Sequence, residues 1–311
     1  MSVQSARFDR LKQAFSAIPH SPLQRLELPL FEQCGVEVWC KRDDLIDPML
    51  SGNKWRKLKY ALLAAAKDNI HTLLSFGGAY SNHLHALAAA GARFGFATRA
   101  IVRGEASSAS NATLSQCRQW GMQLTFVDRQ TYRQRHDPAW LASLAEPGLM
   151  LLAEGGSGPL ALDGVGELVA EVPFSPDLWV LPCASGGTLT GLLKVKRPDE
   201  KVLGIAVIKG GTALRDTVTN LWPGAACDPH WRIALEHHDG GYARFSSELW
   251  QWLQTVTMQT GLPLEPVYSG KALWGLCREL AAGRIQRGSR IVFVHTGGMQ
   301  GLAGLKERGL C

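Results

Sequence analysis

The sequence lacks the marks of membrane, secreted and disulfide-bonded proteins. No run of about twenty apolar residues occurs, so no segment is expected to cross a membrane as a helix. Residues 1–12 are polar and charged and contain no apolar signal core. The seven cysteines are odd in number and include no Cys-x-x-Cys pair, which favours free thiols over a disulfide framework. We therefore expect a soluble, cytoplasmic protein.

Motifs for nucleic acids, metals and nucleoside triphosphates are missing as well. The formal net charge is +6, but the basic residues are dispersed and no zinc finger occurs, so we expect no nucleic-acid partner. His83 and His85 lie two residues apart and His237 and His238 are adjacent, and neither spacing is typical of zinc. No glycine loop ends in Gly-Lys-Ser/Thr, which disfavours triphosphate chemistry. We therefore expect no metal centre.

The composition that is present is that of an ordinary enzyme with an α/β fold. The 311 residues are 46% hydrophobic and 19% charged, enough to bury one or two cores. Strand-like runs alternate with helical stretches, a pattern typical of parallel sheets. The runs are 36–40, 72–75, 97–102, 124–127, 178–181, 202–207 and 291–294. We expect a discontinuous large lobe (1–60 and 151–311) and a small lobe (61–150), with the ligand between them.

A lysine stands where a helix is expected to begin. The stretch Ser51-Gly52-Asn53-Lys54-Trp55-Arg56-Lys57 leads into a helix-forming run, residues 55–67, with apolar residues at Leu58, Ala61, Leu62 and Ala65. A lysine amine attacks an aldehyde only when it is neutral, so a partly desolvated Lys54 is suited to a Schiff base with a cofactor. Gly52 allows close approach of a ligand, and Lys57 adds a cation that attracts a phosphate. The alternative is a basic amphipathic helix with solvated lysines.

Two further segments have the composition of turns between a strand and a helix. In Ser75-Phe76-Gly77-Gly78-Ala79-Tyr80-Ser81-Asn82-His83, Ser81 and Asn82 would cap a helix and face a ligand. In Cys183-Ala184-Ser185-Gly186-Gly187-Thr188, hydroxyls and backbone N–H groups are suited to surrounding a phosphate. Capping and tight packing of small residues explain each segment taken singly. Together with Lys54 they can converge at one edge of a parallel sheet, where ligands bind.

These segments and several others resemble those of a known family and occur in the same order along the chain. The matching blocks are Pro22-Leu23-Gln24-Arg25-Leu26, Lys41-Arg42-Asp43-Asp44, Ser51 to Leu58, Ser81-Asn82-His83, Glu154-Gly155-Gly156-Ser157, Ser185 to Leu192, Pro266-Val267-Tyr268-Ser269-Gly270-Lys271 and His295-Thr296-Gly297-Gly298. They resemble the pyridoxal-phosphate enzymes of the tryptophan synthase β type, within them the group of D-cysteine desulfhydrase and 1-aminocyclopropane-1-carboxylate deaminase. The resemblance covers most of the chain. It implies two open, twisted parallel-sheet lobes (fold type II), pyridoxal 5'-phosphate as cofactor, an amino-acid substrate and a homodimer.

The resemblance also implies roles for individual residues. Those expected around the cofactor are Lys54 at its aldehyde, Asn82 at its phenolic oxygen, Ser269 or Thr296 at its ring nitrogen, and Lys57, Ala184, Ser185, Gly186, Gly187 and Thr188 at its phosphate. Those expected at the substrate are Asn53, Ser81, His83 and Tyr268, and the candidate bases for the α-proton are Lys54, Ser81 and Tyr268. A tyrosine needs a neighbouring cation or the cofactor to lower its pKa from about 10 before it acts as a base. The alternative for Tyr268 is a buried aromatic residue.

Position 269 helps to choose between the two activities. The deaminase pattern has glutamate directly after the tyrosine, whereas this chain has Ser269. A hydroxyl hydrogen-bonds the ring nitrogen without stabilising a full positive charge, so it delocalises a carbanion less well. β-Elimination tolerates weaker delocalisation, because the departing thiolate takes the electron pair of the carbanion's charge away. We expect β-elimination from D-cysteine to pyruvate, ammonia and sulfide, with 1-aminocyclopropane-1-carboxylate deaminase as the alternative.

Three departures from the family pattern leave the substrate open. Tyr80 stands in place of glutamine, Trp55 in place of a smaller residue, and residues 208–250 are shorter than the pattern and unlike it. A different D-amino acid or a thioether is therefore possible. Two other classes are weaker alternatives: a dinucleotide oxidoreductase, from Gly156-x-Gly158-x-x-Ala161, which contains Pro159 and lacks a ribose-binding acid, and a non-catalytic cofactor-binding protein.

Overall fold

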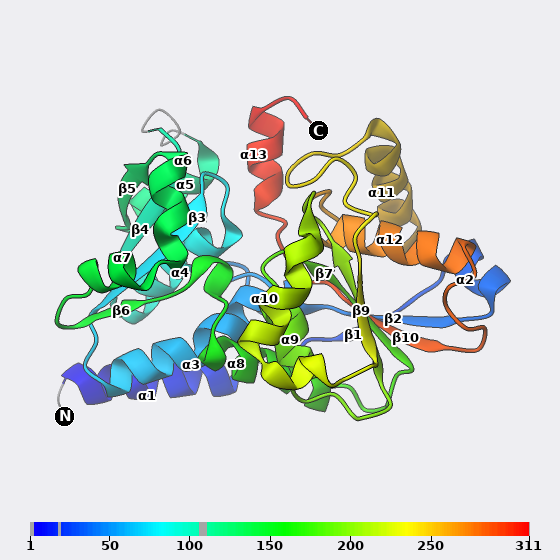
Figure 1. Cartoon of the computed structure of the whole chain (residues 1–311), viewed down its shortest axis with the longest axis horizontal. Coiled ribbons are helices and arrows are strands. Elements are labelled where there is room, and N and C mark those ends of the chain that lie inside the picture. Colours follow the sequence, from blue (N-terminus) through cyan, green and yellow to red (C-terminus); the bar gives the residue numbers. More distant parts are fainter. Residues whose placement is uncertain (1–2, 18–19, 106–110, 311) are drawn as a thin grey trace.

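The strands of the protein form two sheets. The computed structural model describes residues 3–17, 20–105 and 111–310, and within them the larger sheet has the strand order β1-β2-β10-β7-β8-β9 and the smaller one β5-β4-β3-β6 (Figure 1). Neighbouring strands are parallel except β1 and β2, which are antiparallel. The strands are β1 (Leu23–Leu26), β2 (Glu37–Lys41), β3 (Thr72–Gly78), β4 (Ala97–Arg103), β5 (Gln123–Val127), β6 (Leu149–Leu151), β7 (Leu178–Cys183), β8 (Lys201–Ala206), β9 (Trp231–Ala234) and β10 (Arg290–Val294).

Helices pack around both sheets (Figure 1). They are α1 (Val3–Ala17), α2 (Pro29–Cys34), α3 (Asn53–Lys67), α4 (Asn82–Phe94), α5 (Ala112–Gln119), α6 (Arg129–Arg133), α7 (Pro138–Ser143), α8 (Pro159–Ala170), α9 (Gly187–Leu193), α10 (Leu214–Leu221), α11 (Ser247–Thr260), α12 (Ser269–Ala281) and α13 (Gly301–Glu307). Among the described residues, no helix combines the length and the apolar character needed to cross a membrane.

The predicted α/β class with two parallel-sheet lobes is confirmed. All seven predicted strands are present, with ends that differ by at most three residues. The strands β1, β6 and β9 were not predicted, because three or four residues are too few to show a hydrophobic pattern. Pairing with a longer neighbour defines them instead, as where Thr72 of β3 lies opposite Leu149 of β6.

The helix α3 leads away from the larger sheet and into the smaller lobe. Its predicted apolar positions, from Leu58 to Ala65, are buried. The helix packs closely against α8, where a Cβ at Gly164 would lie 2.0 Å from the backbone oxygen of Arg56. The predicted lobe boundaries at 60/61 and 150/151 fall inside α3 and β6, and the division of the chain into domains stays a prediction.

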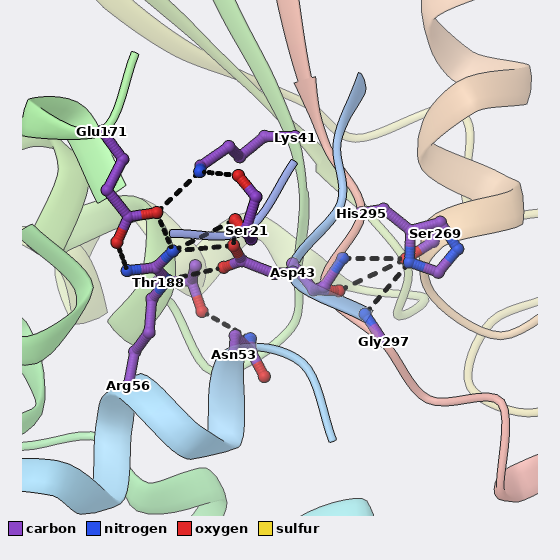
Figure 2. A network of polar contacts seen from close by, with 11 residues as sticks. Ser21, Lys41, Asp43, Asn53, Arg56, Glu171, Thr188, Ser269, His295 and Gly297 are labelled. Atoms are coloured by element: carbon purple, nitrogen blue, oxygen red, sulfur yellow. Dashed lines mark hydrogen bonds and ion pairs between the residues drawn. The ribbon is translucent and has the colours of Figure 1, made fainter. Parts of the chain in front are cut away.

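A buried ion network fixes the start of α3 (Figure 2). Arg56 donates two hydrogen bonds to Asp43, at 2.8 and 2.9 Å, and two to Glu171, at 2.7 and 2.8 Å. Lys41 Nζ donates to Glu171 at 2.6 Å. Asp43 and Lys41 have no exposed surface. Because Arg56 follows Lys54 by two residues on one helix, the network also fixes the position of that lysine.

We predict that this network makes the protein sensitive to acid. Burial raises the pKa of the Glu171 carboxyl, but the hydrogen bonds and charges of Arg56 and Lys41 outweigh it and lower the pKa to about 2. Because the folded pKa lies below the ordinary value of 4.5, Glu171 stabilises the fold above pH 4.5 and this contribution is lost as the pH falls towards 2. The difference corresponds to about 3 kcal/mol in the free energy of unfolding.

Urea unfolding of the native protein and of Glu171→Gln, at neutral pH and at about pH 3, measures this contribution. The native protein should be the more stable of the two at neutral pH and should lose more free energy of unfolding on acidification. Equal losses in the two proteins would contradict the prediction.

Candidate functional site

Two lysines meet at one carbonyl oxygen near the start of α3. Lys54 Nζ lies 3.4 Å and Lys57 Nζ 3.2 Å from the backbone oxygen of Gly155. Within the described chain neither lysine pairs with a carboxylate. Burial lowers the pKa of Lys54 to about 8, and burial followed by the charge of Lys54 lowers the pKa of Lys57 well below 10.5. Lys57 is buried and Lys54 half-buried, and two adjacent amines that pair with no described carboxylate form a site for an anion.

The turn before α3 requires glycine. Gly52 has a φ of 63°, and a Cβ there would lie 2.0 Å from the backbone oxygen of Thr296. The backbone N–H of Asn53 donates to the same oxygen at 3.1 Å, and its side-chain amide donates to Thr188 Oγ1 at 2.8 Å (Figure 2). This close approach places Lys54 beside the segment after β10 and the turn before α9. A role of Asn53 toward substrate stays a prediction.

The predicted phosphate turn, Ala184-Ser185-Gly186-Gly187-Thr188, joins β7 to α9 beside Lys57. Ser185 Oγ lies 2.9 Å from Ser157 Oγ, which lies 3.5 Å from Lys57 Nζ. The missing side chain of Gly187 leaves room here, since a Cβ would lie 2.4 Å from Ser157 Oγ and 3.2 Å from Lys57 Nζ. Two hydroxyls, an ammonium group and a small-residue turn fit a phosphate group.

The turn between β3 and α4 brings Ser81 and Asn82 to the same region. Ser81 is the N-cap of α4, as predicted, and its Oγ accepts from the backbone N–H of Leu84 at 3.3 Å. Asn82 is the first residue of the helix. A Cβ at Gly298 would lie 3.1 Å from Asn82 Nδ2, so this glycine leaves the amide accessible on that side. The strand ends that carry Asn82 and Gly298 therefore meet, although they belong to different sheets.

His83 is buried beside the two lysines. Its Nε2 lies 2.8 Å from Ser75 Oγ, and its Nδ1 is buried without a hydrogen-bond partner in the described structure. Burial, and then the charges of Lys54 and Lys57, lower the pKa of His83 well below 6.5, so the ring is neutral. A Cβ at Gly156 would lie 2.9 Å from this ring. Contact of His83 with substrate stays a prediction.

Tyr268 lies in surroundings that oppose its ionisation. Burial, and then the charge and hydrogen bond of Tyr242, raise the pKa of Tyr268 well above 10. The two rings meet edge to face, with centroids 6.0 Å apart. Burial and the neighbouring tyrosine dominate, and both keep the Tyr268 hydroxyl protonated. The protonated hydroxyl is suited to donating a proton.

Glu265 organises the turn that carries Tyr268 and Ser269. Its carboxylate oxygens accept hydrogen bonds from the backbone N–H groups of Val267 and Ser269 at 2.6 Å and of Tyr268 at 3.0 Å. Burial raises the pKa of Glu265 to about 8, although these amides favour the ionised form. Ser269 Oγ lies 3.4 Å from Thr296 Oγ1, so the two hydroxyls predicted to contact the ring nitrogen lie together.

Gly155, Ser157 and Glu265 belong to the site but are not among the predicted site residues. Gly155 and Ser157 lie in the block Glu154-Gly155-Gly156-Ser157, which overlaps the dinucleotide motif of the rival interpretation. Because Gly155 contacts Lys54 and Lys57, we assign the block to the lysine site and not to a dinucleotide. Glu265 is detectable in the sequence as an acid that follows the apolar stretch Leu262-Pro263-Leu264.

A cavity and an acidic cluster lie away from Lys54 and Lys57. The cavity, about 550 Å³, is lined by residues at the amino-terminal ends of strands in the larger sheet, among them Leu178 and Lys201. The cluster consists of Glu236, His237 and Glu279, whose ligand atoms lie within 4.8 Å of one another. Glu279 is already bound by His237 at 2.7 Å and by arginines. We interpret the cluster as an ion network, and the expected absence of a metal stays a prediction.

Comparisons with known proteins match the chain over nearly its whole length. The family model described as "Pyridoxal-phosphate dependent enzyme" matches residues 15–297. The chain is 29% identical to the bifunctional D-cysteine desulfhydrase/1-aminocyclopropane-1-carboxylate deaminase, mitochondrial, of Arabidopsis thaliana, over 91% of this chain and 77% of that protein. It is 28% identical to D-cysteine desulfhydrase of Serratia proteamaculans, over 95% and 96%. The crystal structure of an ACC deaminase homologue covers 97% of this chain and 99% of its own, with a TM-score of 0.77 and 25% identity.

The family match includes the lysine pair, the phosphate turn and both sheets. The predicted cofactor, pyridoxal 5'-phosphate, and the predicted class of lyase are confirmed by this family and by the names of the relatives. The chain belongs to the family of pyridoxal-phosphate-dependent enzymes.

Proposed function

We propose that the protein catalyses β-elimination from a small D-amino acid, in the first place D-cysteine, to give pyruvate, ammonia and sulfide. The observation that carries the proposal is Lys54, a half-buried residue whose desolvated amine has a pKa of about 8, beside Lys57 and the phosphate turn. A desolvated amine next to an anion site is what the covalent attachment of a phosphorylated aldehyde requires. Two relatives are named as D-cysteine desulfhydrases, and these names support the substrate.

The residues of the site fit the cofactor. Lys54 would bind its aldehyde carbon, Asn82 its phenolic oxygen, and Lys57 with Ser157 and the phosphate turn its phosphate. When bound, pyridoxal phosphate supplies an electron sink that makes the Cα–H bond of the amino acid acidic. Two adjacent lysines that pair with no carboxylate of the described chain support this assignment, because the phosphate would provide the missing negative charge.

Lys54 is the best base for the α-proton among the three candidates. With a pKa of about 8, roughly one amine in ten is neutral at pH 7. The raised pKa of Tyr268 keeps its hydroxyl protonated, so we assign Tyr268 to donating a proton to the leaving sulfur. Ser81 Oγ already accepts a hydrogen bond from the backbone N–H of Leu84, which leaves its own proton for the substrate carboxylate.

The hydroxyls of Ser269 and Thr296 favour elimination over ring opening. They lie 3.4 Å apart and both are buried. Hydroxyls hydrogen-bond a pyridine nitrogen without fixing a positive charge on it. Loss of a thiolate requires less delocalisation of negative charge into the ring than the opening of a cyclopropane does. Glu265, the acid of the same turn, directs its oxygens at backbone amides. Deamination of 1-aminocyclopropane-1-carboxylate is the second candidate, since one relative carries both activities in its name.

We further propose a homodimer in the cytoplasm. The six described cysteines, Cys34, Cys40, Cys117, Cys183, Cys227 and Cys277, are free thiols, as in proteins of reducing compartments. The homodimer rests on the family resemblance. Light scattering during gel filtration measures the mass, and a monomer would contradict the proposal.

We predict that D-cysteine is the preferred substrate of a matched panel. With L-cysteine, D-serine and 1-aminocyclopropane-1-carboxylate beside it, kcat/KM should be at least about tenfold higher for D-cysteine. Pyruvate and sulfide should appear in equal amounts, because one C–S bond is broken for each pyruvate formed. Higher turnover of the cyclopropane substrate, detected as 2-oxobutyrate, would replace the proposal by the second candidate.

A further inference from the structure

Four arginines from distant parts of the chain gather around one cavity. The cavity has a volume of about 420 Å³, and Arg103, Arg129, Arg244 and Arg308 line it. They come from the end of β4, the start of α6, the segment between β9 and α11, and the residue after α13 (Figure 1). Because these segments are far apart in the chain, the basic residues look dispersed in the sequence although they converge in the fold.

The four guanidinium groups have no acidic partner among the residues that the structure describes. Within the described chain none of them forms an ion pair with a carboxylate, and no aspartate or glutamate lines the cavity. Nearby Arg135, in contrast, pairs with Glu154 at 2.6 Å. Arg308 lies instead over the ring of Tyr80, 5.8 Å from its centroid. Converging arginines without counter-charges are suited to binding an anion from solution.

The cavity adjoins the proposed substrate side of the active site. Tyr242 lines it, and the Tyr242 ring meets the Tyr268 ring edge to face. Gly78, Ala79 and Tyr80 also line it, and Ser81 follows them directly. Two of the departures from the family pattern, Tyr80 and the segment 208–250 that contains Tyr242 and Arg244, therefore form walls of this cavity.

On the basis of the proposed β-elimination, we propose that this arginine cavity binds a second anionic group of the substrate, in addition to the α-carboxylate. Beside D-cysteine itself, the protein then favours thioethers of D-cysteine whose sulfur substituent ends in a carboxylate. A free thiol carries no second anionic group for the arginines of this cavity to bind. A carboxylate on the far side of the sulfur places its charge among the arginines.

The reaction needs no further reactant than water. The Cα–H bond breaks and its proton passes to the base, and the Cβ–S bond breaks with its electron pair leaving on sulfur. The leaving sulfur takes a proton from Tyr268, so the products are a thiol that carries the carboxylate and 2-aminoacrylate. The 2-aminoacrylate tautomerises and is hydrolysed by water to pyruvate and ammonia. The arginine cavity acts on the leaving group and leaves this sequence of bond changes unaltered.

The test compares two thioethers that differ only in charge, S-carboxymethyl-D-cysteine and S-carbamoylmethyl-D-cysteine. The carboxylate compound should have a kcat/KM about tenfold higher, since each contact with an exposed arginine contributes little and several act together. The double variant R244Q/R308Q should bring this ratio to within about twofold of unity. Arg215, an exposed arginine that lies over Trp231 at 4.8 Å, is the matched control, and R215Q should keep the native ratio.

The outcomes separate this inference from the proposed function. Turnover of D-cysteine with equal kcat/KM for the two thioethers overturns the anion site and leaves the β-elimination intact. If no amino acid reacts, the proposal of β-elimination is overturned. The anion site can still be tested, because titration with each thioether shifts the absorbance of the bound cofactor and gives a dissociation constant. Equal dissociation constants overturn the anion site, and tighter binding of the carboxylate compound that is lost in R244Q/R308Q supports it.

Discussion

In Lys54→Ala protein, pyridoxal phosphate should no longer be fixed to the chain by borohydride, and elimination should fall by about 10³-fold or more. The reason lies in the amine at position 54, because burial lowers its pKa to about 8 and keeps a neutral fraction available for bonding to carbon. The same amine is our assigned base for the α-proton. Its removal therefore costs both the covalent bond to the cofactor and the proton transfer. Absorbance spectra before and after borohydride, followed by peptide mass spectrometry, measure the bond.

Lys59 on the same helix is the control for this experiment. It forms an ion pair with Glu167 at 2.6 Å, and its side chain is 21% exposed. Lys59→Ala should keep the adduct and the activity, since its amine points away from Gly155 to a partner of its own. Trapping of the cofactor on Lys57 in the Lys54→Ala protein, with activity retained, would contradict our assignment of the two lysines.

The parts of this site that could be predicted are those with a local pattern. Gly52 precedes a helix with a regular apolar face and Lys54 lies in its first turn. The cap formed by Ser81 follows from a hydroxyl before an alanine-rich run. The turn at Ser185 to Thr188 follows a buried strand. Each of these signals lies within about ten residues of chain, so hydrophobic periodicity and turn composition are sufficient to find it.

Contacts between distant segments could not be predicted in this way. The backbone oxygen of Gly155 contacts both lysines, which lie about a hundred positions earlier in the sequence. Local composition does not show which residues so far apart come into contact. The four arginines around the cavity lie on separate segments, so their charges appear dispersed until the chain is folded. The pKa of Tyr268 depends on Tyr242, which lies on a separate segment, so the residue type alone does not show whether Tyr268 is protonated.

The position of Lys54 depends on charges that never touch the substrate. Arg56, two residues later on α3, is 3% exposed and holds the carboxylates of Asp43 and Glu171 (Figure 2). These acids belong to the segment after β2 and the end of α8, so one side chain ties three parts of the chain together. A defect in this network should therefore weaken the fold and the retention of cofactor together.

We predict that Arg56→Met lowers the free energy of unfolding by about 3–5 kcal/mol, because it leaves the carboxylate of Asp43 buried without its cation. Asp43 has no exposed surface, and of its side-chain contacts with described residues it would retain the hydrogen bond from Ser21 Oγ, at 2.7 Å. Urea unfolding at neutral pH, with pyridoxal phosphate in excess for all proteins, gives the value.

An exposed pair of the same length separates the effect of burial from that of charge. Lys194 donates to Asp163 at 2.7 Å, with side chains 39% and 49% exposed, so Lys194→Met should cost no more than about 1 kcal/mol. In the double variant Arg56→Met/Asp43→Asn the stranded charge is gone as well, and stability should recover relative to Arg56→Met alone. A contrary result would be that Asp43→Asn lowers the free energy of unfolding of Arg56→Met by as much as it lowers that of the native protein. The two residues would then act independently. The loss would then come from the packing of the arginine side chain, because only an unpaired buried charge is relieved by removing the second partner.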